Sequence, residues 1–361
     1  MKSTTDNGAK AFLARIEETE FFAHYSMLGE GNIRQFDWEK LESKLTGVEK
    51  GLWKFLLLAE PLAKTEAAKL FGAAALKFLL KHKLCKTVKG KLSMGSIRLI
   101  RFWGLTFFIE RGVSVPAYIG DDSKALLSIL PKLNGGRCLS FYTAGGLEVM
   151  PLVTGAKVEM NFVDAKADEG ILRANLELNA AAENPRPCQF SRNGTGSYDL
   201  IVSNPPYYIQ APGVKLPKYA AGGPDGLKCV RRVLQAASKE LAPHGQALLT
   251  FVFFADLDNT IMEQHLRALL DPYGLNYRVA ISSKLLMEPG VPVFNYLIST
   301  AQIKGPEELE AVMKKTMRHI QRNKFDGAHL IKARFWKREN GQPAEQQITN
   351  YSDSYYGSWT I

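Results

Sequence analysis

The stretch that decides the fold lies at residues 198–208 and reads Tyr-Asp-Leu-Ile-Val-Ser-Asn-Pro-Pro-Tyr-Tyr. Its first six residues predict a buried strand. The two consecutive prolines cannot extend a central strand, because proline has no N–H to donate to the sheet. The chain must therefore turn outward after the strand, and this turn places Asn204 and Tyr207 at the rim of a sheet, where ligands bind.

Short apolar segments alternate with amphipathic segments on both sides of this stretch. We expect strands at residues 137–141, 157–163, 198–203 and 246–254, and closing strands at 277–282 and 295–300. Helices are expected at residues 168–179, 225–241 and 259–270. The alternation predicts an α/β fold with a mostly parallel sheet that has helices on both faces.

The first part of the chain has a different pattern. Apolar positions at helix spacing extend to about residue 82, and residues 84–94 alternate like a hairpin that turns at Lys89-Gly90. Helix, turn, helix and small hairpin predict a winged-helix-like domain. We therefore expect a substrate-recognition or cap domain over residues 1–130, a catalytic domain over 131–303 and a C-terminal extension over 304–361. A charged helix is expected near residues 307–322, and the extension is expected to pack on the catalytic domain.

Composition excludes several classes of protein. With 361 residues, 46% hydrophobic and 23% charged, the chain matches a folded globular protein rather than a disordered one. No apolar run reaches the roughly 20 residues of a membrane span, and the polar start of the chain lacks the apolar core of a secretory signal. The four cysteines form no CxxC pair, which favours reduced thiols and a cytoplasmic location. The histidines form no HExxH motif, so we expect no metal site.

The formal net charge is +10, and the positive excess is concentrated in residues 67–108, which hold nine basic residues and no acidic one. Such clustering is typical of a phosphate-binding surface. The alternative is the solvated face of a cap domain. Candidate contacts to a nucleic acid are the lysines of this window, Lys77, Lys81, Lys86, Lys89 and Lys91.

The turn after residue 203 suits methyl transfer to a planar nitrogen, whose lone pair is delocalised and weakly nucleophilic. The side-chain oxygen of Asn204 and the backbone carbonyl of Pro205 would accept the two N–H groups of such a nitrogen and orient its lone pair. The Tyr207 ring would stack on the flat group, with Tyr208 as a second contact to the substrate. We take Asn204, Pro205 and Tyr207 as the catalytic residues.

These motifs resemble those of the class I S-adenosylmethionine-dependent methyltransferases of the "small domain" type, which carry NPPY after the fourth strand. Residues 222–227 read Gly-Gly-Pro-Asp-Gly-Leu and residues 241–245 read Leu-Ala-Pro-His-Gly, similar to elements of the protein-glutamine methyltransferases. The N6-adenine N-methyltransferases share the NPPY motif. The resemblance implies a Rossmann-like, seven-stranded form of the mostly parallel sheet and S-adenosylmethionine as cofactor. It also implies Asp164, at the end of the second strand, as the residue that binds the ribose hydroxyls.

The sequence departs from this family in the loop after the first strand. Where the family reads like Leu-Asp-Leu-Gly-Thr-Gly-Ser-Gly, residues 139–146 read Leu-Ser-Phe-Tyr-Thr-Ala-Gly-Gly. Tyr142 and Ala144 therefore replace glycines that let the backbone approach the donor. The resemblance implies cofactor contacts in this loop and at the turn, from Tyr142, Thr143, Ala144, Gly145 and Asn204. Asp121 or Asp122 is a candidate for a further contact to the donor's amino group.

The leading hypothesis is an N-directed methyltransferase that depends on S-adenosylmethionine. The acceptor stays open among RNA, a protein glutamine, a peptide and a small metabolite. One alternative is a specialised natural-product enzyme that acts on a small molecule or peptide. An alternative of another class is a nucleic-acid-binding module whose cofactor site has degenerated.

Overall fold

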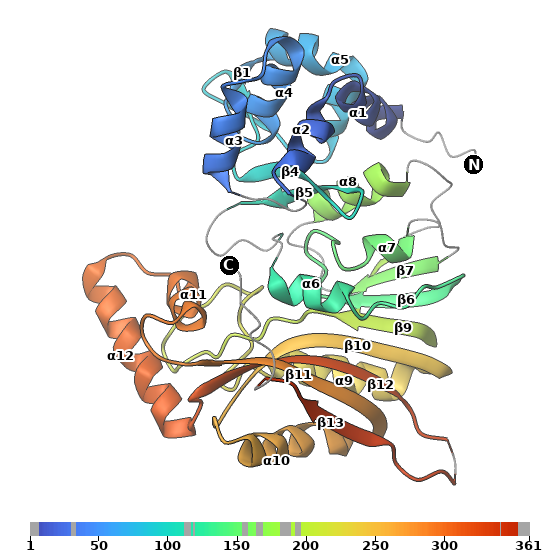
Figure 1. Cartoon of the computed structure of the whole chain (residues 1–361), viewed down its shortest axis with the longest axis vertical. Coiled ribbons are helices and arrows are strands. Elements are labelled where there is room, and N and C mark those ends of the chain that lie inside the picture. The colour runs from blue at the N-terminus through green and yellow to red at the C-terminus, as the bar shows by residue number, and fades with distance from the viewer. Residues whose placement is uncertain are drawn as a thin grey trace. The chain divides into compact units, whose positions relative to one another are not determined.

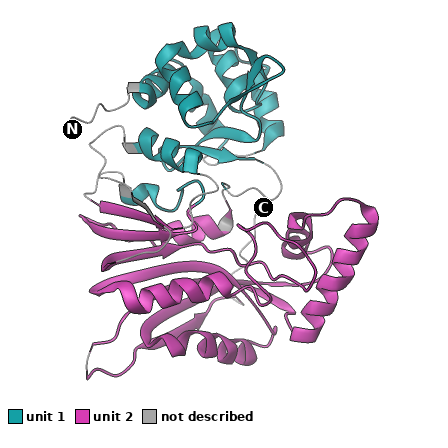
Figure 2. Ribbon diagram, turned by 180° about the vertical axis from the view of Figure 1, so that it is seen from behind, with its two compact units in different colours: residues 1–119, 144–155, 166–185 teal, residues 120–143, 156–165, 186–361 magenta. Residues whose placement is uncertain are grey.

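The structure is a computed structural model that describes residues 7–29, 34–111, 117, 120–153, 158–163, 169–180, 189–191, 196–339 and 341–352. The chain divides into two compact units (Figure 2). Unit 1 comprises residues 1–119, 144–155 and 166–185, and unit 2 comprises residues 120–143, 156–165 and 186–361. The domain limits that the sequence predicts, at residues 130 and 303, stay predictions.

Unit 1 is mainly helical (Figure 1). Its helices are α1 (Asn7–Glu17), α2 (Phe21–Met27), α3 (Gln35–Glu42), α4 (Gly47–Leu56), α5 (Lys64–Lys81), α7 (Met150–Val153) and α8 (Glu169–Ala180). Its strands are β1 (Leu62–Ala63), β2 (Lys86–Val88), β3 (Lys91–Ser93), β4 (Ile97–Phe102) and β5 (Leu105–Glu110).

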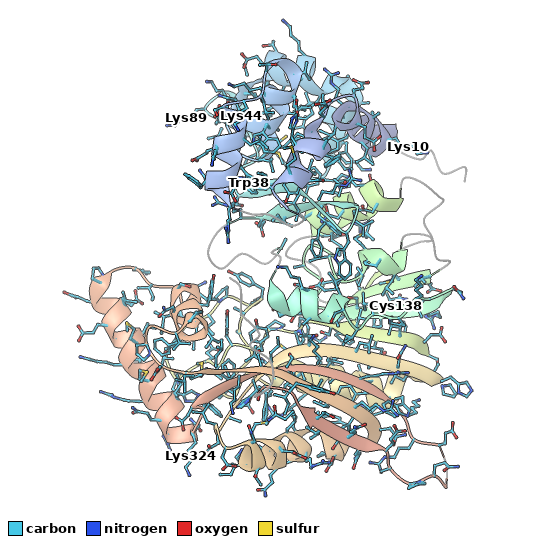
Figure 3. The ribbon with its side chains drawn as sticks, viewed as in Figure 1. Lys10, Trp38, Lys44, Lys89, Cys138 and Lys324 are labelled. Atoms are coloured by element: carbon cyan, nitrogen blue, oxygen red, sulfur yellow. The ribbon has the colours of Figure 1, made fainter. Side chains whose placement is uncertain are left out.

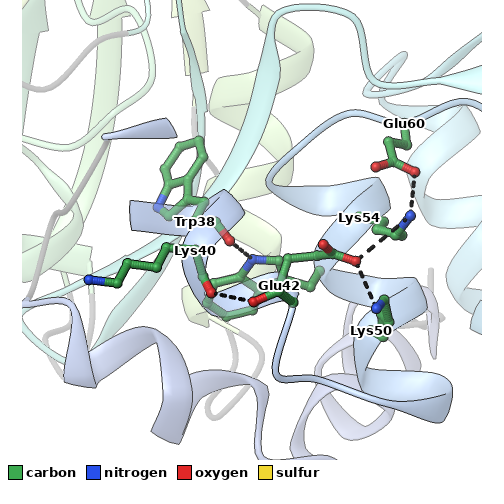
Figure 4. Close-up of polar contacts among 8 residues, drawn as sticks. Trp38, Lys40, Glu42, Lys50, Lys54 and Glu60 are labelled. Atoms are coloured by element: carbon green, nitrogen blue, oxygen red, sulfur yellow. Dashed lines mark hydrogen bonds and ion pairs between the residues drawn. The ribbon is translucent and has the colours of Figure 1, made fainter. Parts of the chain in front are cut away.

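Aromatic packing and one carboxylate hold the helices of unit 1 together. The Phe12 ring of α1 packs on Phe78 and Phe108, with ring centroids 5.7 and 5.6 Å apart. At the outer side, Glu42 of α3 pairs with Lys50 of α4 at 3.2 Å and with Lys54 at 3.7 Å (Figure 4). The apolar contacts supply the core of unit 1, and the exposed ion pairs add little to its stability.

The hairpin predicted at residues 84–94 is present. Strands β2 and β3 pair antiparallel and β1 joins on the far side of β3, so the sheet order is β1-β3-β2. Lys89, labelled in Figure 3, and Gly90 both have positive φ, at 49° and 79°. Two positive φ values are typical of the tight turn that matches the twist of a hairpin. Helix α5 is kinked at Gly72, whose φ is 74°.

Unit 2 is built on an eight-stranded sheet with the order β13-β11-β12-β10-β9-β6-β7-β8. Its strands are β6 (Gly136–Phe141), β7 (Val158–Val163), β8 (Gln189–Ser191), β9 (Tyr198–Ser203), β10 (Leu241–Ala255), β11 (Leu275–Leu286), β12 (Gly327–Lys337) and β13 (Gln346–Asn350). Its helices are α6 (Asp121–Leu127), α9 (Lys228–Glu240), α10 (Asn259–Leu270), the 3-10 helix η2 (Asp271–Tyr273), α11 (Pro292–Thr300) and α12 (Pro306–Asn323).

The mostly parallel sheet predicted from the sequence is confirmed. Strands β7, β6, β9 and β10 run parallel, whereas β12 is antiparallel to both of its neighbours, β10 and β11. An eighth strand, β13, adds to β11. Both β12 and β13 come from residues 304–361, so much of this segment belongs to the sheet itself.

The strand predicted at residues 295–300 is wrong, because these residues form the end of helix α11. Pro292 stands at the first helical position, where its fixed φ favours a helix. The buried Val293, Phe294, Leu297 and Ile298 follow helical spacing and pack into one apolar cluster. The place beside β10 in the sheet is taken by β12 instead.

Helices cover both faces of this sheet, because successive strand residues point to opposite sides. In β10, Ala247, Leu249, Phe251, Phe253 and Ala255 join a cluster with α9 and α10. On the other face, residues of β10 and β12 pack with α6, α11 and α12. Both clusters are deeply buried and form the core of unit 2.

Two further features concern the described residues alone. None of their helices has the length and apolar character needed to cross a membrane. Cys85, Cys138 and Cys229 are buried free thiols, and Cys138 lies on β6 (Figure 3). Cys188 lies outside the residues that the structure describes.

Candidate functional site

The order of the strands in unit 2 reverses at β6. From β6 the chain continues to β7 and β8 on one side, and then returns to β9 and β10 on the other. Ligands of open α/β sheets bind at such a switch point, outside the carboxyl ends of the strands. Phe141 and Ser203 end the two strands, and the Ser203 hydroxyl donates a hydrogen bond to the Phe141 carbonyl at 3.3 Å. The turns that follow β6 and β9 therefore form the candidate site.

Asn204 lies directly after β9, as the sequence predicts. Its side-chain oxygen Oδ1 is buried and has no hydrogen-bond partner among the described residues. Burying an amide oxygen without a partner costs about 1–3 kcal/mol. An N–H group from a ligand would offset this cost, so Asn204 is suited to receive a hydrogen-bond donor.

Tyr207 is held in place by a carboxylate that is distant in sequence. Its hydroxyl donates a hydrogen bond to Oδ2 of Asp122 on α6 at 3.0 Å. Asp122 is only 3% exposed, and its Oδ1 accepts a hydrogen bond from the Ser123 backbone N–H. The predicted contact from Asp122 to the donor's amino group stays a prediction, and the structure gives this carboxylate a partner in Tyr207.

Tyr208 packs against Tyr207 and is tied to the following segment through its backbone. The two rings meet edge to face with centroids 5.2 Å apart, and burial raises the pKa of the Tyr208 phenol. Its backbone N–H donates to the Ala220 carbonyl and its own carbonyl accepts from Gly222. These bonds fasten the turn to the segment that follows, and the predicted contact from Tyr208 to substrate stays a prediction.

The segment at residues 222–227 packs directly against the turn after β9. A Cβ atom on Gly222 would lie 2.7 Å from the Tyr207 carbonyl carbon, and one on Gly226 would overlap the Tyr207 carbonyl oxygen. Gly226 also has a φ of 77°, which disfavours other residues. Both glycines are therefore required for the backbone to approach the Asn-Pro-Pro-Tyr turn.

Asp225 and Arg231 fix the start of α9. The Asp225 carboxylate pairs with the Arg231 guanidinium at 2.5 Å and accepts a hydrogen bond from the Leu227 N–H at 3.0 Å. Burial raises the pKa of Asp225, but the hydrogen bonds from Arg231 and Leu227 more than offset it, and the pKa lies below its ordinary value. The pair orders the loop that supports the turn.

In the loop after β6, Tyr142 has the backbone conformation of a glycine although it is not one. Tyr142 has a φ of 59°, the left-handed conformation that glycine adopts freely and other residues adopt at a cost of roughly 1–2 kcal/mol. Its ring packs beside Phe141, and its hydroxyl lies 3.5 Å from Arg232 of α9. Burial raises the pKa of this phenol. The side chain therefore packs toward α9, and the backbone follows the course that a glycine would take.

The remaining predicted cofactor residues fall into three groups. Thr143 is 2% exposed, and its hydroxyl forms a short hydrogen bond with Ser140. Ala144 and Gly145 belong to unit 1, where Asn175 of α8 donates to the Gly145 carbonyl at 2.7 Å. Asp164 lies outside the described residues.

The basic window in unit 1 is not uniformly available to a ligand. Arg98 is 9% exposed and donates to the carbonyls of Gly95 and Ile97, and burial lowers its pKa to about 10. Lys81 pairs with Glu177 at 3.2 Å. All five lysines of the predicted set, Lys77, Lys81, Lys86, Lys89 and Lys91, are exposed, and Lys81 is the one of them shown in an ion pair.

Sequence reasoning missed two functional features of this site. The partner of Tyr207 is 85 residues away in the chain, and no local pattern links the two. The role of Gly222 and Gly226 as packing partners of the turn was also not foreseen. Glycine at both positions was a usable signal, because it often marks a close approach of two backbones.

Comparison with known proteins gives a sequence match to part of a curated protein. No protein-family model matches the chain. The chain is 29% identical over 176 residues to the ribosomal protein uL3 glutamine methyltransferase of Bradyrhizobium diazoefficiens, a match that covers 39% of this chain and 51% of that protein. The chain thus spans about half the length of this curated relative.

Solved structures resemble the chain more distantly. A putative methyltransferase from Bacillus halodurans has a TM-score of 0.39 and 10% identity, and the match covers 61% of this chain and all of that one. A Haemonchus contortus phosphoethanolamine N-methyltransferase in complex with S-adenosylmethionine has a TM-score of 0.33 and 12% identity, over 61% and 52% of the chains. With TM-scores this low, neither structure bears on function. The sequence match and the sheet fit a Rossmann-like methyltransferase fold.

Proposed function

We propose that the protein is an S-adenosylmethionine-dependent N-methyltransferase whose acceptor is a planar amide or amine nitrogen. The observation that carries this proposal is the buried, unpartnered Oδ1 of Asn204 at the carboxyl end of β9. An acceptor without a donor at the switch point of the sheet is suited to a ligand N–H group.

The residues of the turn account for the chemistry. Asn204 Oδ1 and the Pro205 carbonyl each accept one N–H of the acceptor group, which favours a pyramidal nitrogen and directs its lone pair. The Tyr207 ring packs on the flat group. Because the Tyr207 hydroxyl is bound to Asp122, the ring keeps a fixed orientation. No general base of unusual pKa is needed for this step.

The residues around the first turn support the choice of methyl donor. S-adenosylmethionine supplies an electrophilic methyl group on a sulfonium centre. Tyr142 and Thr143 are the proposed donor contacts in unit 2, and Tyr142 has a positive φ, the backbone conformation that glycine adopts freely. The donor contacts expected from Asp164, Ala144 and Gly145 stay predictions from the sequence.

The sequence match supports the choice of the first acceptor class to test. The curated relative is named as a glutamine methyltransferase, so a glutamine side chain in a peptide is the first acceptor to test. RNA and small metabolites are the alternatives, and the specialised small-molecule enzyme remains the second form of the proposal.

We also propose that the winged-helix-like domain expected over residues 1–130 recruits or caps the substrate. The kinked α5, the β2–β3 hairpin and the short β1 support this proposal. Its candidate contacts to a nucleic acid are the exposed Lys77, Lys81, Lys86, Lys89 and Lys91.

The test combines binding and turnover. Calorimetric titration with S-adenosylmethionine and with S-adenosylhomocysteine measures donor affinity in the wild-type protein and in Asp164→Ala. Transfer of a tritiated methyl group is then followed with three acceptor pools, namely glutamine-containing peptides, single-stranded RNA and a small-metabolite extract. Asn204→Ala is the test variant, and Asn323→Ala, an exposed asparagine at the end of α12, is the matched control.

We expect micromolar donor binding that is weakened in Asp164→Ala. Because Asn204 is also a predicted donor contact, Asn204→Ala should weaken donor binding as well, but by far less than it lowers methyl transfer. Methyl transfer is expected to fall roughly 100-fold in Asn204→Ala, the typical effect of losing one positioned hydrogen-bonding group, and to persist in Asn323→Ala. Absence of donor binding would overturn the proposal in favour of a binding module. Full turnover by Asn204→Ala would overturn the role of the turn.

A further inference from the structure

A cavity of about 480 Å³ lies along the outward face of α9 in unit 2. Helix α9 buries its apolar residues against the sheet, including Val230, Val233, Leu234 and Ala237. The residues of the opposite face line the cavity together with Pro272 and Tyr273 of η2. The cavity is therefore built from one polar helix face and a short aromatic wall.

The lining of this cavity is strongly positive. It includes Lys228, Arg231, Arg232 and Lys239, and no carboxylate is among the lining residues. Arg231 is held by Asp225 and Arg232 lies close to Tyr142. Lys228 and Lys239 are exposed, and neither forms an ion pair within the described part of the chain. The two lysines are thus available to an anionic ligand.

A second cavity of about 390 Å³ adjoins the first and has a different character. The two share Arg231, Pro272 and Tyr273 as a common wall. Phe253 and Phe254 line the second cavity but are only 3% and 2% exposed, so the partly exposed rings that it offers to a ligand are those of Tyr273 and Phe325. Its one carboxylate, Asp225, is paired with Arg231. An aromatic cavity beside a cationic one provides two distinct kinds of contact.

The backbone of Tyr273, at the wall that the two cavities share, is held by a hydrogen bond from α9. The Ser238 hydroxyl of α9 donates a hydrogen bond to the Tyr273 backbone carbonyl at 2.9 Å. Because this bond uses the backbone, it holds the residue in position and leaves the ring as part of both cavity walls.

We propose that these joined cavities bind a single-stranded nucleic acid, with phosphates along α9 and a base in the aromatic cavity. Cationic grooves that follow the backbone, combined with aromatic side chains on which bases stack, are the general means of holding single strands. The proposal goes beyond the methyl-transfer function and does not depend on it, because binding needs no donor.

The spacing of the lysines favours a strand over a single nucleotide. Lys228 and Lys239 are eleven residues apart, which is about three helical turns and about 16 Å along the axis of α9. They therefore lie on the same face but too far apart for one phosphate to bridge. An acidic peptide would satisfy the lysines, but it would leave the aromatic cavity unused.

The site also adjoins the Asn-Pro-Pro-Tyr turn. Asp225 and Leu227 line the aromatic cavity, and Gly226 between them packs against the Tyr207 carbonyl. A strand bound here lies beside the segment that supports the acceptor turn. Substrate recruitment and chemistry would then be served by neighbouring parts of one unit.

The experiment measures the anisotropy of a fluorescent 12-nucleotide single-stranded RNA with the full chain, without donor. In Lys228→Gln/Lys239→Gln we expect at least tenfold weaker binding, and the slope of log affinity against log salt should fall by about 1.4, or about 0.7 for each lost phosphate contact. Tyr273→Ala should weaken binding roughly tenfold and leave the salt slope unchanged, whereas Tyr273→Phe, which keeps the ring, should bind like the wild type.

Two controls distinguish this surface from others. Lys215→Gln/Lys218→Gln removes two exposed lysines of unit 2 that line neither cavity, and we expect its binding to be unchanged. Lys86→Gln/Lys89→Gln/Lys91→Gln tests the hairpin of unit 1.

The proposal is overturned if binding is lost only in the hairpin variant, or if the α9 double variant binds like its control. It is also overturned if a poly-glutamate peptide displaces the RNA and Tyr273→Ala has no effect, because the ligand would then be an acidic polymer in general. Loss of RNA binding in the α9 variant with unchanged donor affinity supports the site, whatever the outcome of the methyl-transfer assay.

Discussion

The turns after β6 and β9 lie at the ends of neighbouring strands, but they differ in whether their polar groups have hydrogen-bond partners. After β6, the hydroxyls of Ser140 and Thr143 bond to each other and Tyr142 packs toward α9. After β9, the Asn204 oxygen is buried without a partner within the described residues. The hydroxyls of the first turn are hydrogen-bonded to each other, whereas the second turn holds a buried acceptor that has no donor among the described residues. This difference indicates that the turn after β9 is the one suited to accept a hydrogen bond from a ligand.

The largest expected effect is that a variant of the turn after β9 loses turnover, whereas a variant of the turn after β6 loses stability. Asn204→Ala should lose roughly 100-fold in turnover, while its free energy of unfolding should stay the same or rise, because the variant removes an unpaired buried amide. Thr143→Ala should show the opposite pattern. It leaves the Ser140 hydroxyl without its partner and should lose about 1 kcal/mol of stability.

Chemical denaturation and methyl transfer measured on the same preparations check this pair. A marked loss of stability in Asn204→Ala would show that its amide has a structural partner, and the contrast between the turns would then fail.

The next effect concerns Gly226, which packs against the turn after β9. Gly226→Ala should be destabilised by about 2 kcal/mol more than Gly213→Ala, because overlap with a packed neighbour adds to the strain of positive φ. Both glycines have nearly the same φ, at 77° and 76°. A Cβ on Gly213 would meet only the flexible Lys315 side chain at 3.5 Å. The difference between their denaturation midpoints therefore reports the close packing of Gly226 against the Tyr207 carbonyl oxygen and the Phe254 ring, and equal midpoints would contradict it.

A smaller effect is expected at the Asp122–Tyr207 hydrogen bond. Tyr207→Phe and Asp122→Ala should each lower turnover about tenfold, because a freer ring holds the acceptor less well. The double variant should lose no more than either single one, since both remove the same bond. Asp122→Asn keeps an oxygen that can accept and should retain most of the activity. Additive losses in the double variant would refute the shared role.

The smallest effect is expected at Tyr142. Tyr142→Gly relieves the cost of positive φ, roughly 1–2 kcal/mol, but it loses a half-buried ring whose packing contributes a similar amount. Stability should therefore change by about 1 kcal/mol or less. Donor affinity measured by calorimetry should stay within about threefold, because the backbone already has the conformation of a glycine. A large gain in affinity would mean that the Tyr142 side chain obstructs the donor.

The parts of the fold that could be predicted are those set by local pattern. The strand at residues 198–203 and the helix at 259–270 have the bounds expected from alternation and helical spacing. Residues 295–300 were misassigned because β-branched and aromatic residues favour strands on average, whereas packing against α12 and the sheet decided for a helix. Strands β12 and β13 were not assigned, since their pairing depends on segments far away in the chain.

The candidate site divides in the same way. Asn204 was placed by the end of the strand at Ser203, and Tyr207 by the two prolines that stand between it and Asn204. Asp122 was suggested for a different contact, because nothing near it in the sequence specifies Tyr207 as its partner. The cationic face of α9 is visible in the sequence as helical spacing, but the cavity also needs η2, which only the folded chain brings alongside.

The position of β12 has a consequence for how the protein is made. Because β12 lies between β10 and β11, these two earlier strands cannot reach their final places until residues 327–337 have been synthesised. Until then, the nascent chain has an apolar strand, β10, with an open edge available for pairing with other chains. Synthesis that pauses between residues 286 and 327 would prolong this exposure, so the rate of translation over α11 and α12 should influence how much of the protein escapes aggregation.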